Sequence, residues 1–184
     1  MYKKYIKEYK NYPSEGVNYI DVNPLYQDVQ IRTKLVKDCV EKVKKLDFDY
    51  IGIVESRGFI MGSIIAHELG KSVVLLRSKR WVFDNWGEKS RLTGKTYTVK
   101  RKLNGGESIT QVQKGNGKVL LFDDVLASGG TAEDCIEVLW KAGYTPISAL
   151  FLVELDFLNK NYPYHRFNIP HESIINYSEG EIFN

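Results

Sequence analysis

Two adjacent carboxylates, Asp123 and Asp124, follow an apolar run and precede a turn of small residues. The stretch 118–131 reads KVLLFDDVLASGGT. The continuous apolar run at 119–122 is typical of a strand that is covered on both faces, so we expect the carboxylates where the strand ends. Apolar residues after Thr131 recur with helical spacing. The stretch therefore predicts a strand, a pair of acids, a turn and a helix in direct succession.

The glycine turn, residues 127–131, has the composition of an anion-binding site. Gly129 and Gly130 leave backbone N–H groups free to converge on one anion, and the start of the following helix adds unpaired N–H groups. Ser128 and Thr131 add hydroxyl donors. The nearby carboxylates can accept hydrogen bonds from a diol or hold a divalent cation that does so. The pattern predicts a phosphorylated ribose as the ligand. The alternative is an ordinary Gly-Gly turn with a capping hydroxyl.

A second strand–turn–helix unit occurs earlier in the chain. Tyr50–Val54 is a predicted strand, and a predicted helix runs to about Leu69. Between them lies the arginine turn, residues 55–58, which reads ESRG. Arg57 can present a planar fork of donors to phosphate oxygens; the alternative is a helix-capping turn with a surface arginine. Because ligands of parallel sheets lie at the carboxyl ends of the strands, we expect the two turns at one edge.

The composition indicates one globular domain. The chain has 184 residues, of which 43% are hydrophobic and 27% are charged, and its net charge of +3 is too small to indicate nucleic-acid binding. No apolar run is long enough to span a membrane, and no signal peptide is recognisable. Cys39 and Cys135 fall on apolar helical positions, which predicts buried reduced thiols. We therefore expect a cytoplasmic protein whose partners are small molecules, not nucleic acid or membrane.

Strands alternate with helices along the chain, which predicts an α/β fold with a mostly parallel central sheet and helices on both faces. We expect the first ten residues to form a short helix and the tail to add an edge strand. The other expected elements are a helix over Gln30–Leu46, strands over Ser72–Leu76, Lys118–Phe122 and Ser148–Val153, and a hairpin of Thr96–Arg101 with Glu107–Gln111.

The segment 77–95 is basic, and aromatic residues are interleaved with its charges. This mixture occurs in sites for single-stranded nucleic acid. A long loop in a compact α/β domain is more often functional, so we interpret the segment as a lid over a phosphorylated substrate.

Three motifs together resemble the type I phosphoribosyltransferase family, and among its members the adenine phosphoribosyltransferases most. LLFDDVLASGGT resembles the motif that binds 5-phosphoribosyl pyrophosphate (PRPP), and ESRGFIMG resembles the loop that holds its pyrophosphate. NYPSEGVNYIDVNPL resembles the segment that covers the purine. The resemblance implies a single domain over 1–184, with a hood segment at 1–29 and a lid at 77–95. It also implies a homodimer and Mg²⁺ that is bound mainly through PRPP, not by protein side chains.

The resemblance assigns roles to individual positions. A non-proline cis peptide is expected near Glu55–Ser56, and Asp123, Asp124 and Lys100 stand at catalytic positions. The base is expected against Asn18, Tyr19, Ile20 and Val125. The positions expected to bind PRPP are Glu55, Ser56, Arg57, Gly58, Arg77, Lys79, Asp123, Asp124, Ala127, Ser128, Gly129, Gly130 and Thr131.

The implied reaction is purine salvage: ribose 5-phosphate passes from PRPP to adenine, which gives AMP and pyrophosphate. Ala127 and the lysine-free strand SALFLV favour adenine, because enzymes for 6-oxopurines carry Asp and Lys in these places. Lys100 points the other way, since the family has there a Glu that is proposed to help protonate the purine. Guanine, hypoxanthine or xanthine therefore stay open as substrates, and so does a non-catalytic regulator that senses PRPP.

Overall fold

The computed structural model describes residues 1–12, 15, 19–80, 95–103, 106–160 and 168–182. Among them, no helix is long and apolar enough to cross a membrane. In chain order the elements are η1 (Tyr2–Tyr5), β1 (Lys7–Tyr9), β2 (Tyr19–Asp21), α1 (Asn23–Gln27), α2 (Val29–Val43), β3 (Tyr50–Val54), α3 (Gly58–Glu68), β4 (Ser72–Arg80), β5 (Thr96–Leu103), β6 (Gly106–Gln113), β7 (Gly117–Leu126), α4 (Gly130–Ala142), β8 (Tyr144–Leu155), α5 (Asp156–Lys160) and β9 (His171–Tyr177).

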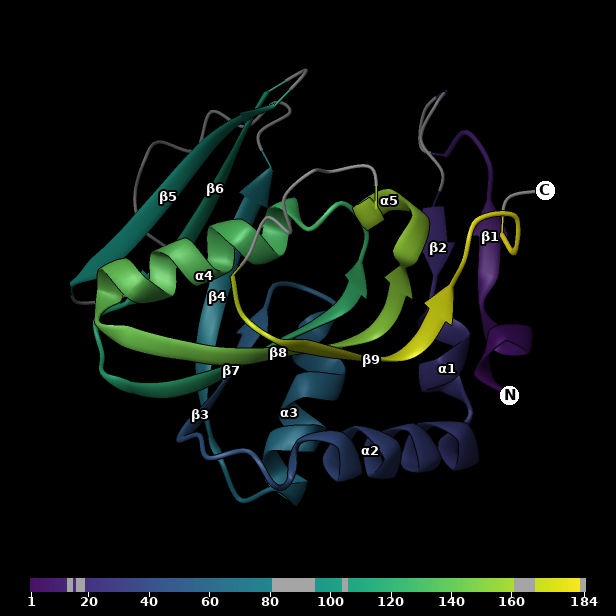
Figure 1. Ribbon diagram of the computed structural model, residues 1–184, viewed down its shortest axis with the longest axis horizontal. Coiled ribbons are helices and arrows are strands. Elements are labelled where there is room, and N and C mark those ends of the chain that lie inside the picture. The colour runs from purple at the N-terminus through teal and green to yellow at the C-terminus, as the bar shows by residue number, and fades with distance from the viewer. Residues whose placement is uncertain (13–14, 16–18, 81–94, 104–105, 161–167, 183–184) are drawn as a thin grey trace.

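A seven-stranded sheet in the order β5-β6-β4-β3-β7-β8-β9 forms the centre of the molecule (Figure 1). The strands from β4 to β9 pair in parallel, while β6 and β5 add an antiparallel hairpin at one edge. Helices α2 and α3 cover one face and α4 covers the other (Figure 1). The predicted fold class, the hairpin and the edge strand of the tail are confirmed.

The central strands are buried on both faces, as the continuous apolar run of β7 predicted. Leu120 and Phe122 pack with the residues of α2 and α3, whereas Val119 and Leu121 pack with those of α4. All four side chains are 0% exposed. The two thiols are free and buried, one in each of these layers. The strand ends that carry the polar site are thus fixed from both sides.

The hood segment is a separate small layer beside the main sheet. Strands β1 and β2 pair antiparallel, with Lys7 opposite Asp21. The expected helix over the first ten residues is wrong beyond its first turn. The backbone becomes extended at Ile6, because the next residues pair with β2. The side chain of Ile6 is nevertheless buried in the core, which explains the apolar spacing.

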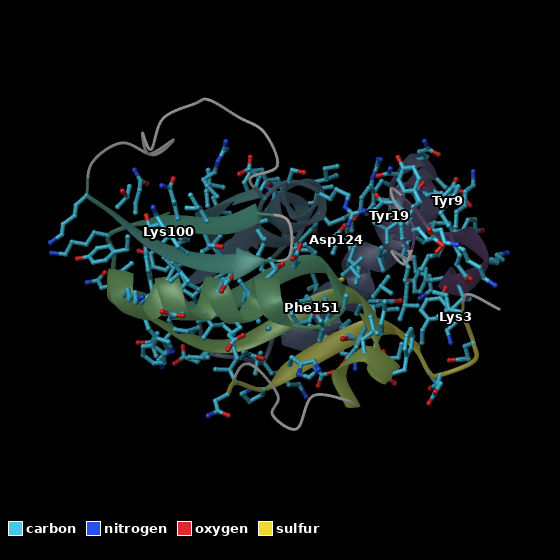
Figure 2. The ribbon with its side chains drawn as sticks, turned by 90° about the horizontal axis from the view of Figure 1, so that it is seen from above. Lys3, Tyr9, Tyr19, Lys100, Asp124 and Phe151 are labelled. Carbon is cyan, nitrogen blue, oxygen red and sulfur yellow. The ribbon has the colours of Figure 1, made fainter. Side chains whose placement is uncertain are left out.

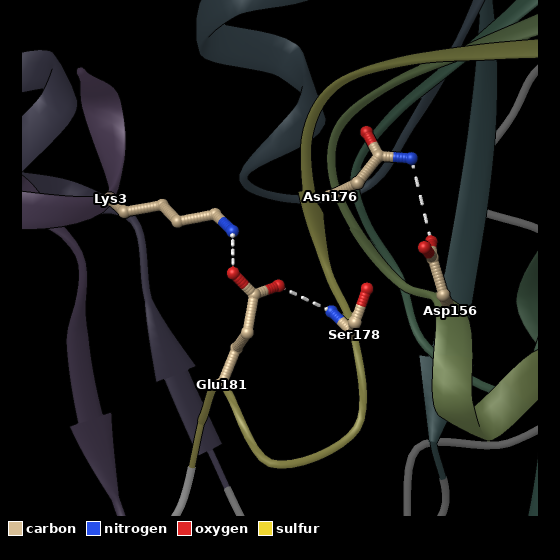
Figure 3. Close-up of polar contacts among 5 residues, drawn as sticks. All are labelled: Lys3, Asp156, Asn176, Ser178 and Glu181. Atoms are coloured by element: carbon tan, nitrogen blue, oxygen red, sulfur yellow. Dashed lines mark hydrogen bonds and ion pairs between the residues drawn. The ribbon is translucent and has the colours of Figure 1, made fainter.

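Polar contacts tie the hood segment to the tail of the chain (Figure 3). Lys3 Nζ lies 2.7 Å from Glu181 Oε1, and the other oxygen of that carboxylate accepts a 2.7 Å hydrogen bond from the backbone N–H of Ser178. Nearby, Asn176 Nδ2 donates a 3.4 Å hydrogen bond to Asp156 Oδ1. The chain ends therefore help to position the hood segment next to the sheet.

Several predicted boundaries are wrong, among them the start of β8, which lies at Tyr144 and not at Ser148. Strand β7 does not end at Phe122 but continues to Leu126, because Val125 pairs with Val153 of β8 beyond the carboxylates. Strand β4 continues through Arg80 along β6, so the first four residues of the segment 77–95 are strand. Residues 81–94 of that segment lie outside the described residues. Helix α2 ends at Val43, three residues before the predicted end.

Candidate active site

Asp123 and Asp124 lie side by side near the carboxyl end of β7, and both belong to the strand. The backbone N–H of Asp124 donates a 2.8 Å hydrogen bond to Asp123 Oδ1. Asp124 is 5% exposed, and its Oδ2 lies 2.6 Å from Arg57 Nε. The structure thus joins the acidic pair to the arginine turn, which comes from a different strand–turn–helix unit.

Burial raises the pKa of both carboxyls above the usual range. For Asp123 the largest cause is burial, followed by the charge of Asp124. Burial also raises the pKa of Asp124, and the Arg57 guanidinium is the strongest influence in the opposite direction. Arg57 is therefore the group that most favours a negative charge on Asp124 in the free protein.

The arginine turn has the backbone that the resemblance implied, because the Glu55–Ser56 peptide bond is cis. Arg57 caps helix α3 and reaches in two directions. Besides its ion pair with Asp124, its Nη1 donates a 2.6 Å hydrogen bond to Tyr19 Oη, and its guanidinium lies 5.3 Å from the centre of that ring. One side chain thus connects the hood segment to the carboxylates.

Two further contacts set the shape of the arginine turn. Arg77 of β4 lies with its Nη2 3.2 Å from Glu55 Oε1 and with its guanidinium 5.8 Å from the centre of the Phe59 ring. A Cβ at Gly58 would lie 3.3 Å from Asp123 Oδ1, so glycine allows the start of α3 to approach the acidic pair closely. The side chain of Lys79, also expected to bind PRPP, lies outside the described residues.

The glycine turn leads directly into α4. Gly129 has a φ of +78° and caps the helix, and its carbonyl accepts a 2.9 Å hydrogen bond from the N–H of Glu133. No described side chain caps this helix, so the alternative of a capping hydroxyl does not match the described geometry. Ser128 is half-buried and Thr131 is exposed beside the first helical N–H groups. The turn can therefore present backbone and hydroxyl donors to an anion.

The residues expected around the base come from two elements. Tyr19 on β2 is half-buried, and its ring lies edge-on at 5.5 Å from that of Tyr12. Ile20 is 4% exposed and its side chain packs in the core, so its side chain is not available to a base. Val125 on β7 is half-buried, one residue beyond the acidic pair. Asn18 lies outside the described residues.

Lys100 is the expected catalytic residue that the structure does not bring to the acidic pair. It is exposed on β5, which is four strand positions from β7 in the sheet order. With about 4.8 Å between neighbouring strands, this corresponds to about 19 Å. Figure 2 shows Lys100 on the hairpin, away from Asp124 and Tyr19, which lie close to each other.

Sequence reasoning missed one residue, Tyr26 on α1. It is buried at 8% exposure, and the charges of Asp124, Arg57 and Asp123 act on its hydroxyl. In the sequence it is one more apolar residue of the hood segment. The one sequence signal for a role of Tyr26 was the acidic pair itself, because the hydroxyl of a buried tyrosine usually needs a polar partner.

No family model matches the chain. An adenine phosphoribosyltransferase of Caldicellulosiruptor saccharolyticus is 36% identical over 162 residues, which cover 85% of this chain and 86% of the relative. The crystal structure of the adenine phosphoribosyltransferase of Thermoanaerobacter pseudethanolicus superposes with a TM-score of 0.81 at 25% identity, covering 96% of this chain and 98% of the other. The enzyme of that name from Saccharomyces cerevisiae, complexed with an imino-altritol bisphosphate and adenine, gives 0.78 at 26% identity, covering 94% and 96%.

Proposed function

The chain belongs to the adenine phosphoribosyltransferase family, and we propose on this basis that it transfers ribose 5-phosphate from PRPP to adenine. The products are AMP and pyrophosphate, so the reaction is a step of purine salvage. The observation that carries the proposal is the ion pair between Asp124 of the acidic pair and Arg57 of the arginine turn. The glycine turn follows shortly after the acidic pair in the chain. This arrangement supports positions for the ribose, the pyrophosphate and the 5′-phosphate along one edge of a parallel sheet.

Each part of the site has a distinct role in this proposal. The bond from ribose C1 to the pyrophosphate oxygen breaks, a bond from C1 to a purine nitrogen forms, and the base gives up a proton to the departing pyrophosphate or to water. Asp123 and Asp124 hold the ribose hydroxyls and stabilise the positive charge that develops near C1. Arg57 receives the departing pyrophosphate, and the glycine turn keeps the 5′-phosphate in place. The hood segment holds the base against Tyr19.

Magnesium fits this site as a companion of the substrate. Mg²⁺ takes six oxygen ligands, and Asp123 and Asp124 are too few to complete that set, while the second of them is already paired with Arg57. We propose that PRPP oxygens and water supply most of the ligands. When bound, the ion would neutralise part of the charge on the leaving pyrophosphate.

Adenine is the base that the site favours. Ala127 stands at the glycine turn and the buried strand β8 reads SALFLV over residues 148–153, so neither place offers the charged groups implied for a 6-oxopurine. The test is pyrophosphate release from PRPP and Mg²⁺ with adenine, guanine, hypoxanthine, xanthine or no base. Release with adenine alone is expected. Release with a different base alone would mean that this base, and not adenine, is the substrate. Binding of PRPP without turnover would favour a PRPP-sensing regulator.

We also propose that the protein is a homodimer of the cytoplasm. Val73 and Leu75 of β4 are 45% and 41% exposed, and Ile60 of α3 is 48% exposed. Val73 and Leu75 pair with Ile51 and Ile53, so they lie on the face of the sheet that α3 covers. An apolar patch of this kind suits a second copy of the chain. Light scattering should give twice the chain mass, and Leu75→Lys should give the monomer.

The two free buried thiols suit a reducing compartment.

A further inference from the structure

Tyr26 carries a buried hydroxyl that has no hydrogen-bond partner among the described residues. The residue is 8% exposed and belongs to the core between the hood segment, α2 and the sheet. Its backbone is held in place, because Arg32 Nη1 donates a 2.8 Å hydrogen bond to its carbonyl oxygen. A buried polar group without a partner destabilises the fold, and phenylalanine would avoid that cost. The hydroxyl therefore calls for an explanation.

The surroundings of this hydroxyl belong to the active site. Four groups act on it: Asp123 and Asp124 from β7, Arg57 from the arginine turn, and the thiol of Cys39 from α2. Burial raises the pKa of Tyr26 most, and the charge of Asp124 raises it next. The phenol thus stays protonated and can act as a hydrogen-bond donor toward a carboxylate.

A matching acceptor lies in the same region. Asp124 Oδ2 is buried and accepts no aligned hydrogen bond from the described residues, although Arg57 Nε lies 2.6 Å away as an ion-pair partner. In the free protein, then, one donor and one acceptor of the site both lack an aligned hydrogen bond. The charge of Arg57 is the strongest influence that favours a negative charge on Asp124, ahead of Asp123 and the backbone of Val125.

Substrate binding would remove that support. In the proposed reaction Arg57 receives the pyrophosphate, and a guanidinium that turns toward pyrophosphate oxygens leaves Asp124 without its ion pair. A buried carboxylate that loses its partner must gain a hydrogen bond or a proton. Two buried donors in the described residues have no hydrogen-bond partner, the hydroxyl of Tyr26 and Arg77 Nε. The guanidinium of Arg77 is already paired with Glu55, so the hydroxyl of Tyr26 is the donor that we assign to Asp124.

We propose that Tyr26 is a positioning residue that donates to Asp124 when Arg57 turns to the pyrophosphate, and so keeps this carboxylate directed at the ribose hydroxyls. The inference rests on the proposed function, because it needs a pyrophosphate-bearing ligand at the arginine turn. It explains why α1 of the hood segment contributes a buried phenol near the acidic pair of β7.

The test compares Tyr26→Phe with Tyr2→Phe. Tyr2 belongs to the same core and is also 8% exposed, but its hydroxyl donates to Asp38. Tyr26→Phe should melt at or above the wild-type temperature and lose kcat by about 10- to 100-fold, with KM for PRPP little changed. Tyr2→Phe should melt lower and keep its kcat. A Tyr26→Phe variant with wild-type kcat would overturn the proposal, and so would one that only melts lower.

A second measurement separates this inference from the proposed function. In protein labelled with ¹³C at the tyrosine ring carbon that bears oxygen, the Tyr26 signal is the one that Tyr26→Phe lacks. It should shift on addition of magnesium pyrophosphate, whereas the Tyr2 signal should not. An unmoved Tyr26 signal refutes the inference even if the wild type turns over. A shifted signal with no turnover on any base supports the tyrosine and refutes the enzyme.

Discussion

The arginine turn and the glycine turn, at which we propose that the two anionic groups of PRPP bind, are built in opposite ways. The arginine turn consists of charged side chains that already contact the protein: Arg57 pairs with Asp124 and with Tyr19, and Glu55 pairs with Arg77. The glycine turn consists mainly of backbone, with Gly129 in the left-handed region at the start of α4. The first turn is committed to partners in the free protein, and the second is open.

The arginine turn must therefore rearrange to bind an anion, whereas the glycine turn is already formed. An anion at the glycine turn needs no protein contact to break, since its donors are the N–H groups of a fixed helix start. Pyrophosphate at the arginine turn must compete with Asp124 and Tyr19 for Arg57. Part of its binding energy is therefore used to break these contacts. In the proposed complex, pyrophosphate binding would therefore affect the carboxylates and the hood segment, both of which Arg57 contacts.

The largest effect on activity is expected for Arg57→Ala, because it removes the side chain on which the arginine turn depends. We expect kcat/KM to fall by about 10²- to 10³-fold, as for the loss of a donor that stabilises transition-state charge. Steady-state pyrophosphate release measures it. Arg57→Lys keeps the charge but not the fork and should recover only part of the loss. If Arg57→Ala loses less than about fivefold, roughly 1 kcal/mol, the turn does not hold pyrophosphate.

Asp123→Asn tests the cost of the buried acidic pair. The pKa of Asp123 is raised by burial and by Asp124. A carboxyl whose pKa is higher in the folded state contributes stability below its unfolded pKa and loses that contribution as the pH rises through the folded value. The variant should therefore be more stable than the wild type at pH 7.5, and the gain should disappear in acid.

Thermal melts from pH 3 to pH 8 check this prediction. Activity at pH 7.5 should fall by about 10²-fold in the same variant, because the amide cannot stabilise positive charge at the ribose. Asp47→Asn is the control, since Asp47 is an exposed carboxylate paired with Lys118 at the opposite end of β7, and it should keep full activity. A pH-independent melting difference for Asp123→Asn would contradict the raised pKa.

The sequence predicted both turns better than it predicted their connection. Glycines, hydroxyls and a strand-ending ESRG are local signals, and β3 has the predicted bounds. The ion pair between Arg57 and Asp124 joins residues far apart in the chain, so local pattern could not reveal it. The end of β7 was missed for the same reason, because pairing with β8 carries the strand past its acids. Burial of Tyr26 beside those acids likewise depends on how the hood segment packs.

Gly129→Ala sharpens the comparison from the side of the open turn. Its φ of +78° is strained for alanine, which should cost about 1–2 kcal/mol of stability. The change should also weaken ribose 5-phosphate binding about tenfold, roughly 1.4 kcal/mol, in calorimetric titration. Gly180→Ala is the matched control, since its φ is +81° and a Cβ there meets no atom within 4 Å. It should lose similar stability and no affinity. Equal affinity in both variants would mean that the glycine turn binds no phosphate.

The smallest effect is expected for Lys100→Glu, which restores the residue type implied by the resemblance. Lys100 lies on β5, four strand positions from the acidic pair, so neither its ammonium nor a carboxylate there is placed to exchange a proton with the base. We expect adenine turnover to change by less than about threefold, roughly 0.7 kcal/mol. Lys95→Glu makes the same charge change at the other end of the described hairpin and serves as the control. A change above tenfold in Lys100→Glu alone would show that β5 approaches the base during turnover. The comparison of two turns would then have to include the hairpin as a third part of the site.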